Sequence, residues 1–409
     1  MNVWLRVFAI IVIMVAPGVL GNSVARSGSA TVVSIWGGAR HCIVLKSDGT
    51  VWDWGFNWFG KLGDGTVSTF SPADFSNDRH TPIQVHGPGN AGFLTSIIAV
   101  MGGEAHNFAL RSDGTVWSWG GNSFGQLGNG TTTDRSTPVQ VTGLGSIVSL
   151  GGRGYHSLAL ASDGTAWTWG MNGSGQLGNG TLTNSAVPVH VGGLTQVIAV
   201  TGGYNFSLAI RNDRSVWAWG GNQHGSLGDG TTTNRTVAAQ ISGLTSVAEL
   251  SAGWEHAVAV RTDGTVWTWG QNLNGELGDG TTLDALVPHQ VAALTGVVAV
   301  SGGDCHTSVL KSDGTVWTFG CNDRGQLGDG TNTEQHAPVQ VVGLSGVTAI
   351  AARDYHNIAI KSDGSVWTWG WNINGQLGDN TTVDRNKPVQ VVGLASAPPA
   401  TPLNVRIIG

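Results

Sequence analysis

Residues 263–280 read DGTVWTWGQNLNGELGDG, and this phrase recurs with small changes seven times along the chain. The Asp that opens each copy stands at Asp48, Asp113, Asp163, Asp213, Asp263, Asp313 and Asp363. The first two copies are 65 residues apart, and the spacing is then 50 residues five times without drift. A period of about 50 residues with four short strand signals per unit is typical of propeller blades. The sequence therefore predicts an all-β fold, a seven-bladed β-propeller of four-stranded antiparallel blades.

The repeats occupy nearly all of the 409 residues and leave no room for a second folded domain. We expect the propeller to span 31–394, with repeats over about 32–96, 97–146, 147–196, 197–246, 247–296, 297–346 and 347–394. Residues 395–409 contain three prolines and are predicted to be a linker or tail. The repeats either coincide with the blades or are offset so that the two ends of the ring share a blade, and the sequence leaves both open.

The N-terminus differs from the rest of the chain. An unbroken apolar stretch runs from Val7 to Val15, and the small residues Ser23 and Ala25 follow at the spacing that an export peptidase requires. Residues 1–25 are therefore predicted to be a signal peptide, either cleaved or kept as an anchor. The expected location is exported, that is, extracellular, periplasmic or at the cell surface.

Composition excludes several classes of function. Only 11% of residues are charged, the formal net charge is -6, and no basic run occurs. A nucleic-acid partner is therefore not expected, since clustered Lys and Arg carry that affinity. The three cysteines lack the paired spacing of a zinc site, and no hydrolase motif is present. We expect no metal, no cofactor, no membrane contact beyond the export signal, and no enzymatic activity.

One unit indicates the strands of a blade. In the third unit, strands are expected at 147–150, 156–161, 166–170 and 187–191, with Asp163-Gly164 in the turn of the central hairpin. Asp-Gly predicts a two-residue turn in which both central residues have positive φ. Thirteen of the 18 Trp stand in the strand after this turn, where they are interpreted as packing between blades.

The predicted two-residue turn determines which residues lie opposite each other in the sixth hairpin, and so whether its two cysteines can pair. Cys305 and Cys321 lie on the two arms of the sixth hairpin. The simple register places Cys305 opposite Asn322 and points the two sulfur atoms to opposite faces. A disulfide would form only if a bulge shifted the register, so the pairing stays open.

Six histidines occupy one register before the second strand and are interpreted as structural, each bonding backbone within its own blade. They are His41, His106, His156, His256, His306 and His356. The fourth unit departs from the pattern, with Phe206 in the His position, Arg214 where Gly follows the Asp in the other units, and Ala238 in place of Pro.

The loop Asn-x-x-Gly-x-Leu-Gly-Asp/Asn-Gly, the Gly-x-x-His before the second strand and the Asp-Gly turn keep their mutual offsets. With these three motifs the chain resembles the regulator-of-chromosome-condensation repeat family over about nine tenths of its length. Together with the export signal, the resemblance implies a secreted, bacterial-type member. It also implies a protein-binding propeller, with inhibition of an extracellular enzyme or nucleotide exchange on a small GTPase as known activities of the family.

Two sets of loops vary while the rest of each unit repeats. They join the first strand to the second and the third to the fourth, and an up-and-down blade places both at one end, which we call the rim. The three Tyr of the chain all fall in these loops, as expected of a protein-binding face with aromatic anchors. The candidate binding residues are Arg40, Trp58, Phe59, Glu104, Phe124, Tyr155, Tyr204, Trp254, Glu255, Asp304, Asp354 and Tyr355.

The sequence thus favours an exported, non-enzymatic, monomeric scaffold that binds a protein partner through its rim. The alternative is a guanine-nucleotide exchange factor for a small GTPase, which the export signal disfavours because that substrate is cytosolic.

Overall fold

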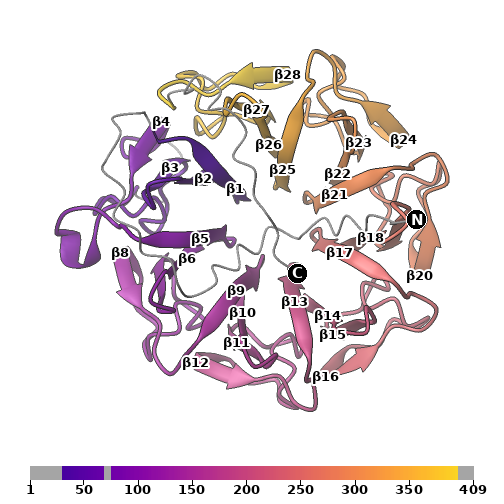
Figure 1. The fold of residues 1–409 in the computed structure, drawn as a ribbon, viewed down its shortest axis with the longest axis horizontal. Coiled ribbons are helices and arrows are strands. Elements are labelled where there is room, and N and C mark those ends of the chain that lie inside the picture. The colour runs from indigo at the N-terminus through magenta and orange to yellow at the C-terminus, as the bar shows by residue number, and fades with distance from the viewer. Residues whose placement is uncertain (1–29, 69–74, 395–409) are drawn as a thin grey trace, which may run out of the picture.

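The computed structural model describes residues 30–68 and 75–394. The predicted export segment and the C-terminal tail lie outside these residues. The described residues form seven four-stranded sheets arranged around a central axis, like the blades of a propeller (Figure 1). The predicted fold class is confirmed.

Four strands follow one another from the axis outward in each blade. The innermost strands are β1 (Val32–Gly38), β5 (Ile97–Gly102), β9 (Ile147–Gly152), β13 (Val197–Gly202), β17 (Val247–Ala252), β21 (Val297–Gly302) and β25 (Val347–Arg353). The second strands are β2 (His41–Lys46), β6 (His106–Arg111), β10 (His156–Ala161), β14 (Phe206–Arg211), β18 (His256–Arg261), β22 (His306–Lys311) and β26 (His356–Lys361). The third strands are β3 (Val51–Gly55), β7 (Val116–Gly120), β11 (Ala166–Gly170), β15 (Val216–Gly220), β19 (Val266–Gly270), β23 (Val316–Gly320) and β27 (Val366–Gly370). The outer strands are β4 (Arg79–Gln84), β8 (Arg135–Gln140), β12 (Ser185–His190), β16 (Arg235–Gln240), β20 (Ala285–Gln290), β24 (Gln335–Gln340) and β28 (Arg385–Gln390), and one short 3-10 turn, η1 (Pro88–Asn90), follows β4.

Each sheet is built from consecutive strands, from β1-β2-β3-β4 to β25-β26-β27-β28. Blades therefore coincide with sequence repeats, and among residues 30–68 and 75–394 no blade combines strands from the two ends of the ring. The ring closes instead by side-chain packing between the first blade and the seventh. There Trp54 and Val44 share one buried cluster with Ile358 and Val366.

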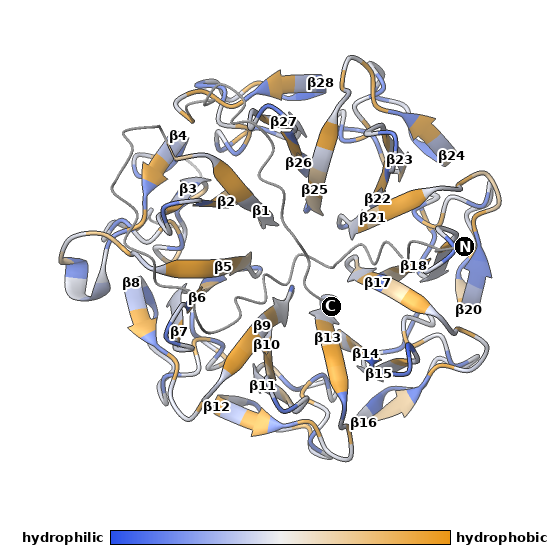
Figure 2. Ribbon diagram, viewed as in Figure 1, coloured by the Kyte–Doolittle hydropathy of each residue, from blue (hydrophilic) through white to orange (hydrophobic). Residues whose placement is uncertain are grey.

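The core lies between blades, and the innermost strands are among the most hydrophobic segments (Figure 2). The second Trp of each hairpin pair is completely buried, and its indole N–H donates to a backbone carbonyl of the preceding blade. In the fifth blade, Trp269 Nε1 lies 2.9 Å from the carbonyl oxygen of Ser226. The sixth blade has Phe319 in this position and lacks the N–H. These tryptophans join neighbouring blades, as their interpretation as packing residues required.

The central hairpins differ from the predicted two-residue turn. In the sixth blade Lys311 pairs with Thr315, its N–H lying 2.9 Å from the Thr315 oxygen, so three residues form the loop. Only the Gly of the Asp-Gly pair has positive φ, +79° at Gly314. Asp313 stays outside that region because its Oδ1 accepts hydrogen bonds from the Thr315 N–H at 3.0 Å and the Thr315 hydroxyl at 2.6 Å. The loop is a three-residue type with a bulge at the Gly.

The histidines are structural, but only His41 bonds backbone within its own blade as the sequence suggested, with Nδ1 3.1 Å from the Ala39 oxygen, whereas Nδ1 of the other five has no partner among the described residues. All six are completely buried, and Nε2 of each contacts a polar side chain of the next blade. His256 Nε2 lies 3.0 Å from the Thr307 hydroxyl, and His356 Nε2 lies 3.2 Å from Cys42 Sγ across the ring closure. Burial lowers the pKa of His256 to about 3, so the ring is neutral.

The fourth blade is a four-stranded sheet like the others, although its sequence departs from the repeat pattern. Phe206 fills the His position and is completely buried. Arg214 adopts φ +64° at the turn, where the other hairpins have Gly.

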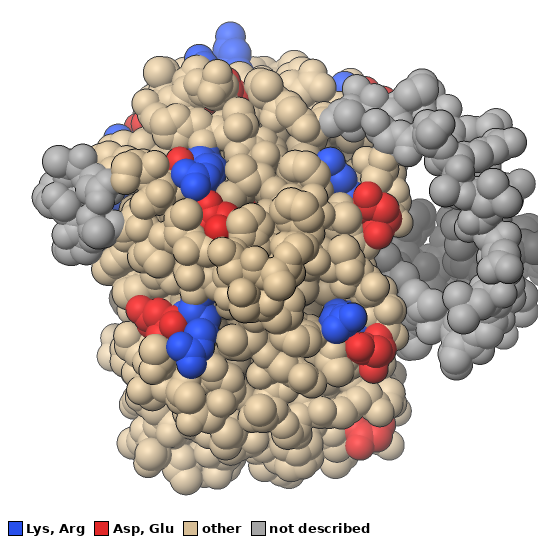
Figure 3. Space-filling model, turned by 90° about the vertical axis from the view of Figure 1, so that its left-hand side faces the viewer, with Lys and Arg blue, Asp and Glu red and all other residues tan. Residues whose placement is uncertain are grey.

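The side of the propeller that faces the viewer in Figure 3 carries few charges. In the side view, Lys and Arg side chains lie beside Asp and Glu on a mostly uncharged surface (Figure 3). Within the described residues, no helix has the length and apolar character needed to cross a membrane.

Candidate protein-binding rim

Both variable loops of each blade meet at the same end of the propeller. The residue after the third strand donates its backbone N–H to the residue before the second strand. In the seventh blade the Trp371 nitrogen lies 2.9 Å from the Tyr355 oxygen, and in the fifth blade the Gln271 nitrogen lies 3.0 Å from the Glu255 oxygen. These bonds fix the two sets of loops as one rim.

Four predicted residues form a continuous aromatic arc over the second to fifth blades. Phe124 contacts Tyr155 edge to face at 5.3 Å between ring centroids, and Tyr155 contacts Tyr204 at 6.1 Å. Tyr204 stacks on Trp254 at 3.8 Å with an interplanar angle of 12°. All four side chains are half-buried. We call Phe124, Tyr155, Tyr204 and Trp254 the aromatic arc.

Tyr355 lies in a second group at the closure of the ring, apart from the arc. It contacts Trp371 edge to face at 5.8 Å. The guanidinium of Arg40 lies over the Trp371 ring, 4.4 Å from its centroid, and 5.7 Å from the centroid of Phe56. Arg40 Nε is 4.0 Å from Asp354 Oδ2. A cation thus already lies between an aromatic face and a carboxylate on this rim.

Trp58 and Phe59 form a separate stack on the loop between β3 and β4, with ring centroids 4.1 Å apart. The sequence assigned both to the rim, and the loop to which they belong lies there.

Polar tips distinguish the rim aromatics from the structural ones. Within the described residues, the hydroxyls of Tyr155, Tyr204 and Tyr355 and the indole N–H groups of Trp254 and Trp371 make no hydrogen bond to protein. Burial and the nearby Glu104 raise the pKa of Tyr155 to about 12, so its hydroxyl remains a donor. Half-buried rings with free polar tips are suited to protein contacts.

A buried Arg from the third blade crosses the axis beneath the rim. Arg153 is 4% exposed. Its Nη1 donates to the carbonyl oxygens of Ala252, at 3.0 Å, and Gly302, in the fifth and sixth blades. Its Nη2 lies 2.6 Å from Asp304 Oδ1. Arg153 therefore ties three blades together at the mouth of the channel.

A second buried Arg comes from the opposite side of the ring. Arg353 is 1% exposed. Its Nη2 donates to the backbone oxygen of Arg153 and lies 3.7 Å from Glu104 Oε2. Arg353 therefore joins the seventh blade to the second and third blades. Below the two guanidinium groups a cavity of about 290 Å³ follows the axis, lined by the innermost strands and by Glu249.

Three carboxylates surround the two arginines, and we call Glu104, Asp304 and Asp354 the carboxylate cluster. Burial and repulsion from Asp304 raise the pKa of Glu104. Burial, followed by repulsion from Asp304 and Glu104, raises the pKa of Asp354 well above its usual range. Both shifts favour the protonated, neutral form of the two carboxyls.

Glu255 forms a different ion pair beside Trp254. Its Oε2 lies 3.2 Å from His224 Nε2, while Nδ1 of the same ring lies 2.7 Å from Asp284 Oδ2. Burial raises the pKa of Glu255. These contacts orient the loop that carries Trp254.

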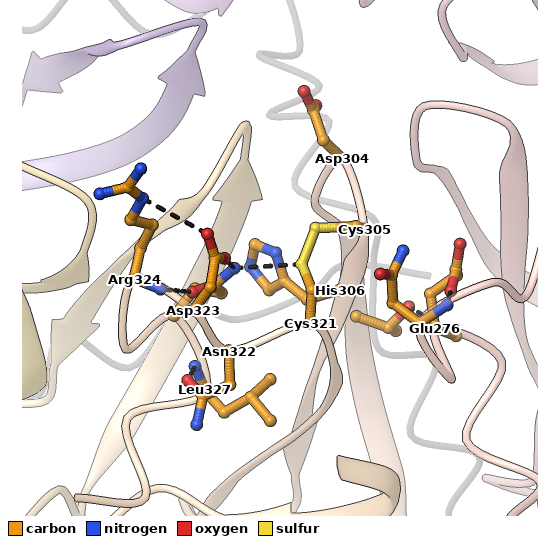
Figure 4. Close-up of a disulfide and its surroundings, with 12 residues drawn as sticks. Glu276, Asp304, Cys305, His306, Cys321, Asn322, Asp323, Arg324 and Leu327 are labelled. Carbon is orange, nitrogen blue, oxygen red and sulfur yellow. Dashed lines mark hydrogen bonds and ion pairs between the residues drawn. A yellow bond between two sulfur atoms is a disulfide. The ribbon is translucent and has the colours of Figure 1, made fainter. Parts of the chain in front are cut away.

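A disulfide joins two loops of the sixth blade at the rim (Figure 4). Cys305 and Cys321 are paired with Cα atoms 5.5 Å apart, and the register that the sequence favoured is wrong. His306 pairs with Gly320, so the next residues outward, Cys305 and Cys321, face each other. The physical reason is the bulge in the three-residue loop, which shifts the register by one residue.

The sequence did not single out four residues of this site. Phe56 and Trp371 each follow the Trp-x-Trp-Gly strand directly, and Arg153 and Arg353 replace the Gly of the Gly-x-x-His motif. The two Arg residues could have been noticed from the sequence, since the other five units keep Gly at that position of the motif.

The geometry defines a class: a closed propeller with buried Trp and His between its blades and one aromatic face. Residues 90–406 match the model of the RCC1-like domain, and residues 48–110 match the regulator of chromosome condensation (RCC1) repeat. The chain belongs to the RCC1-like propeller family.

Curated relatives match over part of the chain. The ultraviolet-B receptor UVR8 of Arabidopsis thaliana is 33% identical over 113 residues, 28% of this chain and 23% of the receptor. The probable E3 ubiquitin-protein ligase HERC3 of Homo sapiens is 32% identical over 118 residues, 29% of this chain and 10% of the ligase. The matched segment thus spans under a quarter of either relative. Both relatives are eukaryotic, so the secreted bacterial-type membership stays a prediction.

Solved structures share the fold. Human WBSCR16 superimposes with a TM-score of 0.71 at 24% identity, covering 81% of this chain and 87% of that one. Prp20p of Saccharomyces cerevisiae, described with its binding to Gsp1p and histones, also gives 0.71, at 21% identity over 85% of this chain and 87% of that one.

Proposed function

We propose that this protein is an exported, non-enzymatic scaffold that binds a protein partner through its rim. The observation that carries the proposal is the hydrogen bonding of the aromatic residues. The fully buried Trp269 donates its N–H to a neighbouring blade, whereas Trp254 is half-buried and its N–H has no acceptor among the described residues. An anchor of this kind gains both apolar contact and a hydrogen bond from a partner.

Relatives support the protein-binding part of the proposal. Prp20p, the yeast RCC1, is described as binding Gsp1p and histones and as bound to Kap60. Nucleotide exchange on a small GTPase is the competing activity. It requires a cytosolic protein, and the apolar segment at Val7–Val15 points to export instead.

Capture from culture supernatant tests the rim. The parent protein is immobilised beside a variant with Tyr204→Ala and Trp254→Ala. A control with Val187→Ala and Val287→Ala removes apolar groups that are 45% and 54% exposed on the outer strands β12 and β20. We expect the rim variant to bind captured partners more weakly by about 2 kcal/mol, because truncation of central anchors typically costs that much, and the control to match the parent. Equal capture by all three proteins would reject the rim as the interface.

Export is tested separately by N-terminal sequencing of the secreted protein. We expect the mature protein to begin near residue 26. Recovery of soluble cytosolic protein that still begins at Met1 would reject export and favour nucleotide exchange.

A further inference from the structure

A separate site lies on the axis of the propeller and is independent of the binding role proposed for the rim. The cavity of about 290 Å³ is bordered by the innermost strands of all seven blades. Its wall is mainly apolar, with several Ser and Thr hydroxyls, and Glu249 is the one ionisable side chain among the described residues that line it. Apolar cavities of roughly 300 Å³ with a few polar groups are typical binding sites for small molecules.

One level of the cavity wall combines a long acidic side chain with six short ones. Glu249 lies in β17 and pairs with Val260 of β18. Its side chain is half-buried and borders the cavity. The residues at the same register in the other blades are all Ser or Ala and all line the cavity: Ser34, Ala99, Ser149, Ala199, Ala299 and Ala349. Because these side chains are short, they leave room at the level of the Glu249 carboxyl.

The fold uses only one oxygen of this carboxyl. Glu249 Oε1 accepts the backbone N–H of Val300 in the next blade, with the nitrogen 3.3 Å away. Two residues further along β17, the hydroxyl of Ser251 makes the same kind of bond to Gly302, at 3.2 Å. A hydroxyl is therefore sufficient to bond the next strand, and Glu249 carries a second oxygen that this role does not need.

The second oxygen of Glu249 is a hydrogen-bond donor at neutral pH. Burial raises the pKa of Glu249 to about 8, and the hydrogen bond from Val300 opposes that shift. The carboxyl is therefore mostly protonated at pH 7, and because Oε1 accepts the Val300 N–H, the proton is on Oε2. Among the described residues, Oε2 has no hydrogen-bond partner and Glu249 forms no ion pair. A donor without an acceptor is costly in a cavity, and an acceptor on a ligand would offset that cost.

We propose that the axial cavity binds a small, mainly apolar molecule with one carbonyl group, whose oxygen accepts a hydrogen bond from Glu249. The apolar wall contacts the hydrocarbon part of this ligand. The short side chains at the level of Glu249 accommodate the carbonyl end. A cationic ligand is disfavoured, because it would first have to displace the proton of the carboxyl.

Methionine methyl groups allow a direct test. Met101 lines the cavity, whereas Met171 lies on the rim, where its backbone nitrogen is 2.9 Å from the Tyr155 oxygen. The other two Met of the chain, Met1 and Met14, precede residue 26. Protein labelled with ¹³C-methyl methionine therefore gives one NMR signal from the cavity and one control signal from the rim of the same molecule. The variant Met101→Leu identifies the cavity signal.

Three ring compounds of similar shape serve as probes. They are cyclohexanone, methylenecyclohexane, which has no acceptor, and cyclohexylammonium, which is cationic. We expect cyclohexanone to shift the Met101 signal saturably and to leave the Met171 signal unchanged. Methylenecyclohexane and cyclohexylammonium should bind at least about tenfold more weakly at pH 7.

The affinity for cyclohexanone should also depend on pH with a definite sign. It should be constant between pH 6 and pH 7 and should fall about tenfold per pH unit above pH 8, because the ionised carboxylate cannot donate a hydrogen bond.

Variants locate the effect. Glu249→Gln keeps a donor, its amide N–H, but does not titrate, so it should bind cyclohexanone within about threefold of the parent at pH 7 and lose the pH dependence. Glu249→Ala removes the donor and should bind about tenfold more weakly. The control is Glu334→Gln, whose carboxylate is 53% exposed just before the outer strand β24, and it should keep the affinity and the pH profile of the parent.

Three results would overturn this assignment. They are the absence of a saturable Met101 shift with cyclohexanone, equal affinity for cyclohexanone and methylenecyclohexane at pH 7, and a decline above pH 8 that is as steep in folded Glu249→Gln as in the parent. Tighter binding of cyclohexylammonium than of cyclohexanone would reject it as well and indicate a cation site. If neither Glu249 variant folds, the comparison of the probes and the pH profile of the parent protein decide.

Discussion

The indole Nε1 of Trp54 lies 2.9 Å from the backbone carbonyl oxygen of Gln376, and this hydrogen bond joins the first blade to the seventh. The same bond recurs between neighbours around the ring, as between Trp119 and Lys61. Because each blade uses strands from a single repeat, such side-chain bonds and the packing around them replace the shared blade that would otherwise close the ring.

Replacing Trp269 by Phe removes one of these bonds while keeping an aromatic ring. Phe319 occupies the equivalent position in the next blade, so the smaller ring is compatible with the fold. We expect a loss of about 1–2 kcal/mol in the free energy of unfolding, since the Ser226 carbonyl loses its buried donor. Urea denaturation measures this loss of stability. Trp254→Phe on the rim serves as the control and should leave stability within about 0.5 kcal/mol; equal losses in both variants would contradict the structural role.

The buried histidines predict a loss of stability in mild acid. Burial lowers the pKa of His256 from 6.5 to about 3. Between these values the unfolded chain binds a proton that the folded chain does not, so the contribution of this His is complete above pH 6.5 and declines as the pH falls. The decline is about 1.4 kcal/mol per pH unit for each such His.

The variant His256→Phe isolates this effect, because Phe206 already fills the same position in the fourth blade. The free energy of unfolding, measured by urea denaturation from pH 7 to pH 4.5, should fall less steeply in the variant, by about 1.4 kcal/mol per pH unit below pH 6.5. Glu249, whose pKa burial raises to about 8, opposes the trend equally in both proteins and cancels in the comparison. Parallel pH profiles would argue against a neutral buried His256.

Gly264 has φ +77°, and a Cβ there would lie 3.3 Å from the Cα of Gly296. We expect Gly264→Val to destabilise the fold by at least about 1 kcal/mol, because a β-branched residue is strained in this region. Gly264→Asn should cost less, since Asn tolerates positive φ, as Arg214 does in the fourth blade. Chemical denaturation of both variants is the measurement, and an unchanged midpoint for Val would be inconsistent with this turn.

The pairing of Cys305 with Cys321 predicts a response to reductant. Intact mass under non-reducing conditions should be about 2 Da below that of the reduced protein, and buried Cys42 should be alkylated only after unfolding. Reduction should lower the unfolding free energy by up to about 3 kcal/mol for a loop of this size. A Cys305→Ser, Cys321→Ser double variant should be insensitive to reductant, and a parent that is equally insensitive would exclude the bond.

The sequence alone determined the number of blades, the order of strands and the end of the propeller where the variable loops gather. These properties follow from local signals: a 50-residue period, the Asp-Gly hairpin turns, and the alternation of chain direction in an up-and-down sheet. The aromatic arc was anticipated for the same reason, because the register of Tyr155, Tyr204 and Trp254 relative to the repeated His could be counted along the chain.

The tertiary structure decided the contacts that depend on strand register or that join residues far apart in the sequence. A bulge of one residue in the hairpin brings Cys305 opposite Cys321. Counting residues from an assumed two-residue turn gives a register that does not pair these cysteines. The histidines bond to the next blade, about 50 residues away. Arg153 and Arg353 meet across the axis from blades 200 residues apart. No local pattern encodes these contacts, since they arise only when the ring closes and brings opposite blades together.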